Sequence, residues 1–131
     1  MSERNAEIVR RMYEAFHAGD LEGALAHFAP DVVVDATRRI DGEMGQGHDE
    51  LNAIIGRWLG AFEEWHEDIE ELRDLGSQVY VVATQRGRGK GSGIDTETRY
   101  AVLYELHAGL ITSMTLYPDP AEALKAAGAA D

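Results

Sequence analysis

Apolar positions in the N-terminal half of the chain recur with the period of an α-helix. One such stripe consists of Ile8, Met12, Ala15 and Phe16. Ser2 is a suitable N-cap for this first helix, Gly19 ends it, and Asp20 caps a second, short helix. A longer stripe predicts a third helix and comprises Leu51, Ile54, Ile55, Trp58, Leu59 and Phe62.

Strand patterns dominate the C-terminal half. β-Branched residues at 32–34 predict a first strand, after which residues 36–47 form a polar loop. Segments 79–84, 98–106 and 110–117 predict three long strands joined by hairpins, and residues 121–127 a last helix. The acidic run 63–74 is interpreted as the solvated end of the third helix. This order predicts one α+β domain over residues 1–131, with N-terminal helices packed on a curved, mostly antiparallel sheet.

The predicted strands carry apolar side chains on both faces. Tyr100, Val102 and Tyr104 share one face of their strand, whereas Ala101 and Leu103 lie on the other. A sheet with one solvated face alternates more strictly between apolar and polar residues. The second face therefore needs a cover, and a symmetric partner is the simplest candidate. We expect a homodimer through the sheet, with a larger internal pocket as the alternative.

Composition and charge narrow the range of functions. The absence of cysteine excludes disulfides and thiolate chemistry. No apolar run reaches signal-peptide or membrane-span length, which predicts a cytoplasmic protein with no membrane partner. The net charge of −12 repels phosphate backbones and predicts no nucleic-acid partner. The Arg- and Gly-rich stretch 86–93 is interpreted as a strand end and hairpin whose glycines let another backbone approach, with ligand binding as the alternative.

Four short segments share a pattern with a known family. They are the turn at residues 17–21, the strand entry at 28–35, the hairpin at 107–111 and the sequence Tyr117-Pro118-Asp119. Through them the chain resembles the cone-shaped α+β fold of the nuclear transport factor two superfamily, in particular its SnoaL-like branch. Relatives include ketosteroid isomerases, scytalone dehydratase, limonene epoxide hydrolase and SnoaL-type polyketide cyclases. The resemblance implies a pocket inside the cone, where low dielectric shifts pKa values and strengthens hydrogen bonds.

The resemblance also argues against one activity of the superfamily. When the turn, the strand entry and the hairpin are aligned, the three catalytic residues of ketosteroid isomerase fall on Met12, Ala36 and Val102. None of these side chains can act as a base or as an oxyanion donor. Steroid isomerisation is therefore not expected.

Two residues are candidate acid/base groups. Asp35 ends an apolar strand beside a loop that can hold a substrate. One residue of register decides whether its carboxylate faces the pocket or turns outward to pair with Arg38 or Arg39. His48 lies at the start of the third helix and titrates near neutral pH. It is either a catalytic group at the pocket rim or a helix cap.

Five further residues are candidate substrate contacts, namely Met12, Trp58, Arg86, Tyr104 and Tyr117. Arg86 either points inward, toward Asp35 or a substrate carboxylate, or remains a surface charge. The tyrosines need hydrogen-bond partners among apolar neighbours. We predict that Asp35, Arg86 and Tyr104 converge in a cavity closed partly by Trp58. The scattered histidines make no metal site, and no cofactor is expected.

Three classes of function remain. The first is a cofactor-free acid/base enzyme of the cyclase, dehydratase or hydrolase type, acting on a small hydrophobic molecule. The second is a non-catalytic ligand-binding or dimerisation module of the same fold. The third, an RNA-associated protein that uses residues 86–93, is disfavoured by the net charge. A raised carboxylate pKa in a closed pocket favours the first, whereas a pocket filled by Met12, Trp58 and tyrosines favours the second.

Overall fold

The computed structural model describes residues 3–39 and 42–128. Its helices are α1 (Glu3–His17), α2 (Leu21–Leu25), α3 (Gly47–Leu59) and α4 (Pro120–Ala126). Its strands are β1 (Phe28–Asp35), β2 (Met44–Gln46), β3 (Phe62–Asp74), β4 (Gln78–Gly89), β5 (Asp95–His107) and β6 (Leu110–Tyr117). Ser2, the expected cap of α1, lies outside the described residues. No helix in the described part of the chain is long and apolar enough to cross a bilayer.

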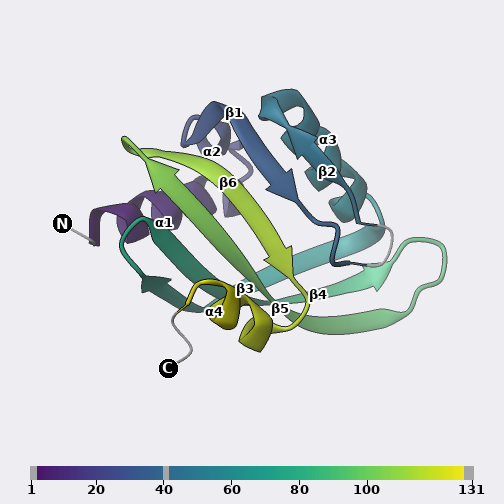
Figure 1. Cartoon of the computed structure of the whole chain (residues 1–131). Helices are drawn as coiled ribbons and strands as arrows, with labels where there is room; N and C mark the ends of the chain where they lie inside the picture. Colours follow the sequence, from purple (N-terminus) through teal and green to yellow (C-terminus); the bar gives the residue numbers. More distant parts are fainter. Residues whose placement is uncertain (1–2, 40–41, 129–131) are drawn as a thin grey trace.

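The strands form one six-stranded sheet in the order β2-β1-β6-β5-β4-β3 (Figure 1). Neighbouring strands are antiparallel except β1 and β6, which run parallel. The register shifts between Ile69 and Glu71 in β3, and such bulges bend and twist a strand. The short strand β2 lies in the segment expected to be a loop. The predicted α+β layout, with helices on a curved and mostly antiparallel sheet, is confirmed.

The main core lies between the sheet and the helices α1, α2 and α3, on what is called here the inner face. Alternate residues of β5 enter this core, whereas Ala101 and Leu103 belong to a second cluster on the outer face. Helix α3 packs on the inner face as predicted, although Phe62 begins β3 rather than ending the helix. The buried inner residues of α3 and β5 are Leu51, Ile54, Trp58, Tyr100, Val102, Tyr104 and Leu106.

The acidic segment 63–74 is a strand, so its interpretation as a helix end is wrong. Helix α3 already ends at Leu59. The side chains of β3 then alternate, with Trp65 and Glu67 facing the inner cavity described below and Asp68 and Glu70 on the outer face. Each of these two outward carboxylates pairs with an arginine of β4 or β5. The density of acidic residues conceals this two-residue period.

Helix α4 covers the second apolar face of the sheet. Tyr80, Val82, Leu103 and Tyr117 are buried there in one cluster with Ala123 of α4. Figure 1 shows α4 on the opposite side of the sheet from α1, α2 and α3. Apolar residues on both faces thus have a cover within the chain itself. The homodimer expected from them stays a prediction.

The stretch 86–93 is a strand end followed by a hairpin, as predicted. Strand β4 ends at Gly89, and β5 starts at Asp95. A Cβ atom at Gly87 would lie 2.6 Å from Cδ1 of Phe62 and 2.7 Å from the carbonyl oxygen of Glu64. Only glycine therefore allows β3 to pack this closely against β4 at that point.

Candidate functional site

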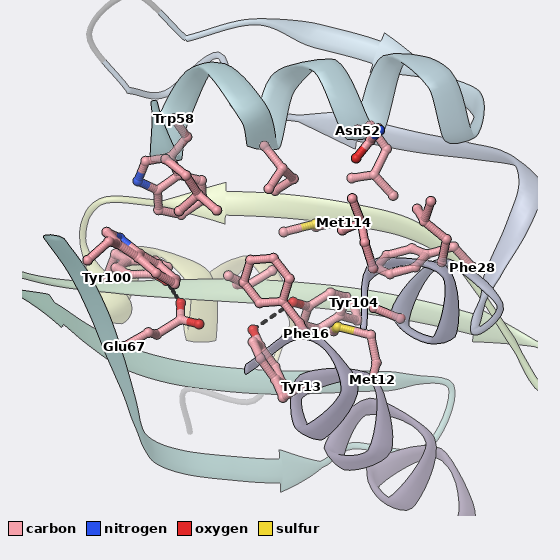
Figure 2. Close-up of a pocket in the computed structure, with 18 residues that line it drawn as sticks. Met12, Tyr13, Phe16, Phe28, Asn52, Trp58, Glu67, Tyr100, Tyr104 and Met114 are labelled. Atoms are coloured by element: carbon pink, nitrogen blue, oxygen red, sulfur yellow. Dashed lines mark hydrogen bonds between the residues drawn. The ribbon is translucent and has the colours of Figure 1, made fainter. Parts of the chain in front are cut away.

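A cavity of about 50 Å³ lies inside the cone, between the inner face of the sheet and helices α1, α2 and α3 (Figure 2). Its wall is mainly apolar, with Phe16, Phe28 and Met114 among the lining residues. Leu21 and Asn52 are exposed, so the cavity reaches solvent between α2 and α3. The volume is smaller than the roughly 150 Å³ of an apolar cavity that binds benzene, so the cavity as it stands admits only water-sized molecules. A larger ligand must therefore displace side chains, and the flexible thioethers of Met12 and Met114 are the easiest to move.

Two phenols meet at the centre of the cavity. Tyr13 of α1 and Tyr104 of β5 are hydrogen-bonded through their hydroxyl oxygens at 2.6 Å, and their rings meet edge to face (Figure 2). Burial raises the pKa of both phenols well above the ordinary value. They are therefore neutral donors at physiological pH. The pair holds two protons but uses only one in this bond, so the other O–H can donate to a ligand oxygen.

Glu67 brings a carboxylate into the same apolar space. Its side chain is only 4% exposed, and it accepts a hydrogen bond from the hydroxyl of Tyr100. Its Oε1 lies 2.9 Å from Nε2 of His17, whose ring is 34% exposed. The bond to Glu67 raises the pKa of His17, against the smaller opposing effect of burial. The carboxylate thus has one partner beside the cavity and one that reaches solvent.

Two indoles form the end of the cavity beside Glu67. Nε1 of Trp58 and Nε1 of Trp65 both donate to Oε1 of Gln85, at 2.8 and 2.9 Å. The Trp58 ring also meets Tyr100 edge to face, at a centroid distance of 5.4 Å. The half-buried amide oxygen of Gln85 thus accepts from both indole N–H groups, which holds the two rings in place.

Three of the sequence-predicted residues, Met12, Trp58 and Tyr104, line the cavity. Asp35 does not, because the buried Val34 takes the inward position of β1 and turns Asp35 outward. Its carboxylate accepts from the backbone and hydroxyl of Thr37 and from Arg38. The Thr37 hydroxyl in particular lowers the pKa of Asp35. This is a turn-stabilising carboxylate.

The remaining predicted residues also lie outside the cavity. Arg86 is on the outer face and pairs with Asp68. Nε2 of His48 donates to the carbonyl oxygen of Phe28 at 2.9 Å, which ties the start of α3 to β1. Tyr117 packs on the outer face, in the cluster that α4 covers. The structure does not bring Asp35, Arg86 and Tyr104 together.

Sequence reasoning misses the most polar part of the site. Glu67 and Tyr100 are not among the predicted site residues, although Tyr100 shares the strand parity of Tyr104. The alternation Trp65-Glu67-Ile69 is the signal that would place Glu67 inward. No group of three or more His, Asp or Glu side chains is arranged for a metal within residues 3–39 and 42–128.

The positions aligned with the catalytic residues of ketosteroid isomerase lie at or near this cavity. Met12 and Val102 line it, whereas Ala36 is buried in the adjoining core. The phenol comes instead from Tyr13, the next residue along α1, and the carboxylate from Glu67 on β3. The three aligned positions thus carry no polar side chain, and the polar groups of the cavity come from other positions of the chain.

The fold agrees with comparisons to known proteins. The family model described as SnoaL-like domain matches residues 9–114, and the chain belongs to this family. No match was found among curated proteins.

Solved structures with the same fold cover almost the whole chain. An NTF2-like protein of unknown function from Burkholderia pseudomallei K96243 is 27% identical, with a TM-score of 0.76 over 93% of this chain and 95% of that one. A candidate polyketide cyclase from Xanthomonas campestris pv. campestris is 21% identical, with a TM-score of 0.71 over 95% and 97%. TerC, co-crystallised with polyporic acid, is 19% identical, with a TM-score of 0.78 over 95% and 98%.

Proposed function

We propose that this SnoaL-like protein binds one compact, largely apolar molecule in the inner cavity and carries out cofactor-free acid/base chemistry on it. The observation that carries this proposal is the Glu67 carboxylate, which is 4% exposed inside an apolar cavity that also holds the phenols of Tyr13, Tyr100 and Tyr104. A carboxylate enclosed beside three phenols is a candidate general base, because it lies within reach of any ligand that fills the cavity. The TerC complex supports a small organic ligand in this fold.

The geometry fits proton abstraction next to a ligand carbonyl. Glu67 takes the proton from the carbon, the electron pair of the broken C–H bond forms a carbon–carbon double bond, and the π pair of the carbonyl moves to its oxygen. The spare O–H of the Tyr13–Tyr104 pair donates to that oxygen and stabilises the negative charge. The resulting enolate is the nucleophile of an aldol-type cyclisation and the intermediate of a carbonyl-assisted dehydration. This chemistry requires only groups that line the cavity.

Exchange of carbon-bound protons tests this proposal without the natural substrate. The probe is 2-indanone in D₂O, whose loss of α-protons is followed by NMR. We expect the protein to accelerate exchange, and Glu67→Gln to remove about 10²- to 10⁴-fold of the acceleration, the usual range for a general base. Asp68→Asn is the matched control, because the neighbouring carboxylate lies on the outer face. Unchanged exchange in Glu67→Gln would refute the role of Glu67.

The second candidate function is a non-catalytic module of the same fold. The observation that favours it is the small volume of the cavity, about 50 Å³, which aromatic and methionine side chains largely fill. In that case 2-indanone shows no enhanced exchange, and the expected homodimer becomes the functional form. Light scattering from micromolar to near-millimolar concentration separates it from a monomer of 14.4 kDa.

A further inference from the structure

The indole of Trp58 separates the inner cavity from two hollows on the surface. One hollow, of about 380 Å³, lies against Arg39, Glu43 and Arg57. The other, of about 60 Å³, lies against Arg39, Gln85 and Tyr100 and is called the Arg39 hollow. Trp58 lines all three spaces, and Tyr100 lines both the cavity and the Arg39 hollow. A molecule that reaches past the indole from inside therefore meets Arg39.

Arg39 is the cation at this boundary. Its Cζ lies 4.6 Å from the centroid of the Trp58 ring, so the guanidinium stacks on the indole. No carboxylate among the described residues lies within ion-pair distance of it. Partial burial lowers the pKa of Arg39, while Glu43 opposes the shift at longer range. Burying part of a guanidinium is costly, and a carboxylate of a ligand in contact with it would offset that cost.

Among the residues that the structure describes, the neighbouring charges are paired with each other and leave Arg39 as the local excess cation. Glu43 is occupied by Arg57, whose Nε and a terminal nitrogen both donate to the carboxylate. Arg38, the adjacent residue, pairs with Asp35 and lies 4.6 Å from the ring centroid of Tyr117. In a chain with a net charge of −12, an accessible cation of this kind is a specific feature and not part of a general basic surface.

We propose that Arg39 is the binding site for an anionic group of the ligand, so that the ligand class is a compact apolar molecule bearing a carboxylate. The apolar part enters the inner cavity, and the carboxylate lies in the Arg39 hollow. Because Trp58 stands between them, its indole must swing away from Gln85 and Arg39 when such a ligand binds. The guanidinium then exchanges the indole face for a bidentate contact with the carboxylate. This inference rests on the proposed function of the cavity.

A matched pair of probes tests it. 3-Phenylpropionate and 3-phenylpropionamide have the same skeleton and differ in charge, and their affinities are measured by calorimetry at low salt. We expect the acid to bind about tenfold more tightly than the amide, as a single charge-assisted contact gives. Arg39→Gln should abolish this preference while leaving the affinity for the amide within about twofold. Arg38→Gln is the control and should keep the preference.

The outcomes separate the two proposals. If both probes bind equally well, or if Arg39→Gln retains the preference for the acid, the Arg39 site is wrong and the cavity proposal stands. If neither probe binds, both proposals fail. A second measurement follows Trp58 in the Trp65→Phe background, where the acid should shift the emission of the remaining indole. Binding of the acid with an unchanged Trp58 spectrum would overturn the proposed movement of the indole.

Discussion

The two faces of the sheet are built from the same strands and serve different purposes. On β3, Glu67 faces the inner cavity and is 4% exposed, whereas the next residue, Asp68, forms a surface ion pair with Arg86. On β5, Tyr104 lies at the centre of the cavity, and its neighbour Leu103 packs under α4. Strand parity alone separates a carboxylate that faces the cavity from one that forms a surface ion pair. The inner face carries the cavity and its polar groups, whereas the outer face carries ion pairs and the cover formed by α4.

The largest expected effect is the loss of stability when Trp58, on the inner face, is replaced. Replacing it with alanine removes a buried indole that packs on Tyr100 and bonds to Gln85, and should lower the free energy of unfolding by about 3–5 kcal/mol. Urea denaturation measures this change. Arg86→Ala, which removes an exposed ion pair of the outer face, should cost at most about 1 kcal/mol. Equal losses for the two variants would contradict the assignment of Trp58 to the core.

The sequence predicts the fold well because periodicity is a local property. The helical stripes of α1 and α3 and the parity of β5 are enough to assign Met12, Trp58 and Tyr104 to the inner face, where all three line the cavity. Successive side chains of a strand face opposite sides of the sheet, however, so an error of one residue in the register reverses the direction of a side chain. For this reason the sequence leaves the direction of Asp35 open, whereas the folded chain turns it outward. The docking of α4 on the outer face is a tertiary contact that no local pattern contains.

Glu67 illustrates a second limit. A segment with many carboxylates is usually solvated. For this reason the acidic composition of residues 63–74 hides the alternation of inward and outward side chains in that segment. The protein tolerates the buried carboxylate only because Tyr100 and His17 hydrogen-bond to it. These partners come from β5 and from α1, and their approach depends on the completed fold. Sequence patterns therefore locate the cavity but not the charge inside it.

The hydrogen-bonded pair of Tyr13 and Tyr104 is expected to have an intermediate effect on the free energy of unfolding. Removing one hydroxyl, in Tyr13→Phe or Tyr104→Phe, leaves the other buried without its partner and should cost about 1–3 kcal/mol. The double variant should cost less than the sum of the two single variants, with a coupling of about 0.5–3 kcal/mol. Tyr80→Phe is the outer-face counterpart. Its hydroxyl donates to the carbonyl oxygen of Pro120 at 3.2 Å, and its loss should cost about 1 kcal/mol.

Urea denaturation of the wild type, the two single variants and the double variant measures the coupling, and Tyr80→Phe is measured beside them. Strict additivity of Tyr13→Phe and Tyr104→Phe would contradict a direct bond between the two phenols.

The smallest expected effect concerns pH and the link between His17 and Glu67. The pKa of His17 is raised in the folded protein, mainly by its bond to Glu67, so the folded state holds this proton more tightly than the unfolded chain does. The resulting stabilisation is complete below the ordinary histidine pKa of about 6.5 and is lost as the pH rises through the higher folded value. Because the His17 ring is 34% exposed, solvent screening limits the effect to at most about 1 kcal/mol.

We expect the difference in unfolding free energy between wild type and His17→Gln to shrink between pH 6 and pH 8. The control is the same comparison in a Glu67→Gln background, where the partner carboxylate is absent and the trend should disappear. A difference that stays constant with pH would mean that the bond to Glu67 does not raise the pKa of His17 in the folded protein.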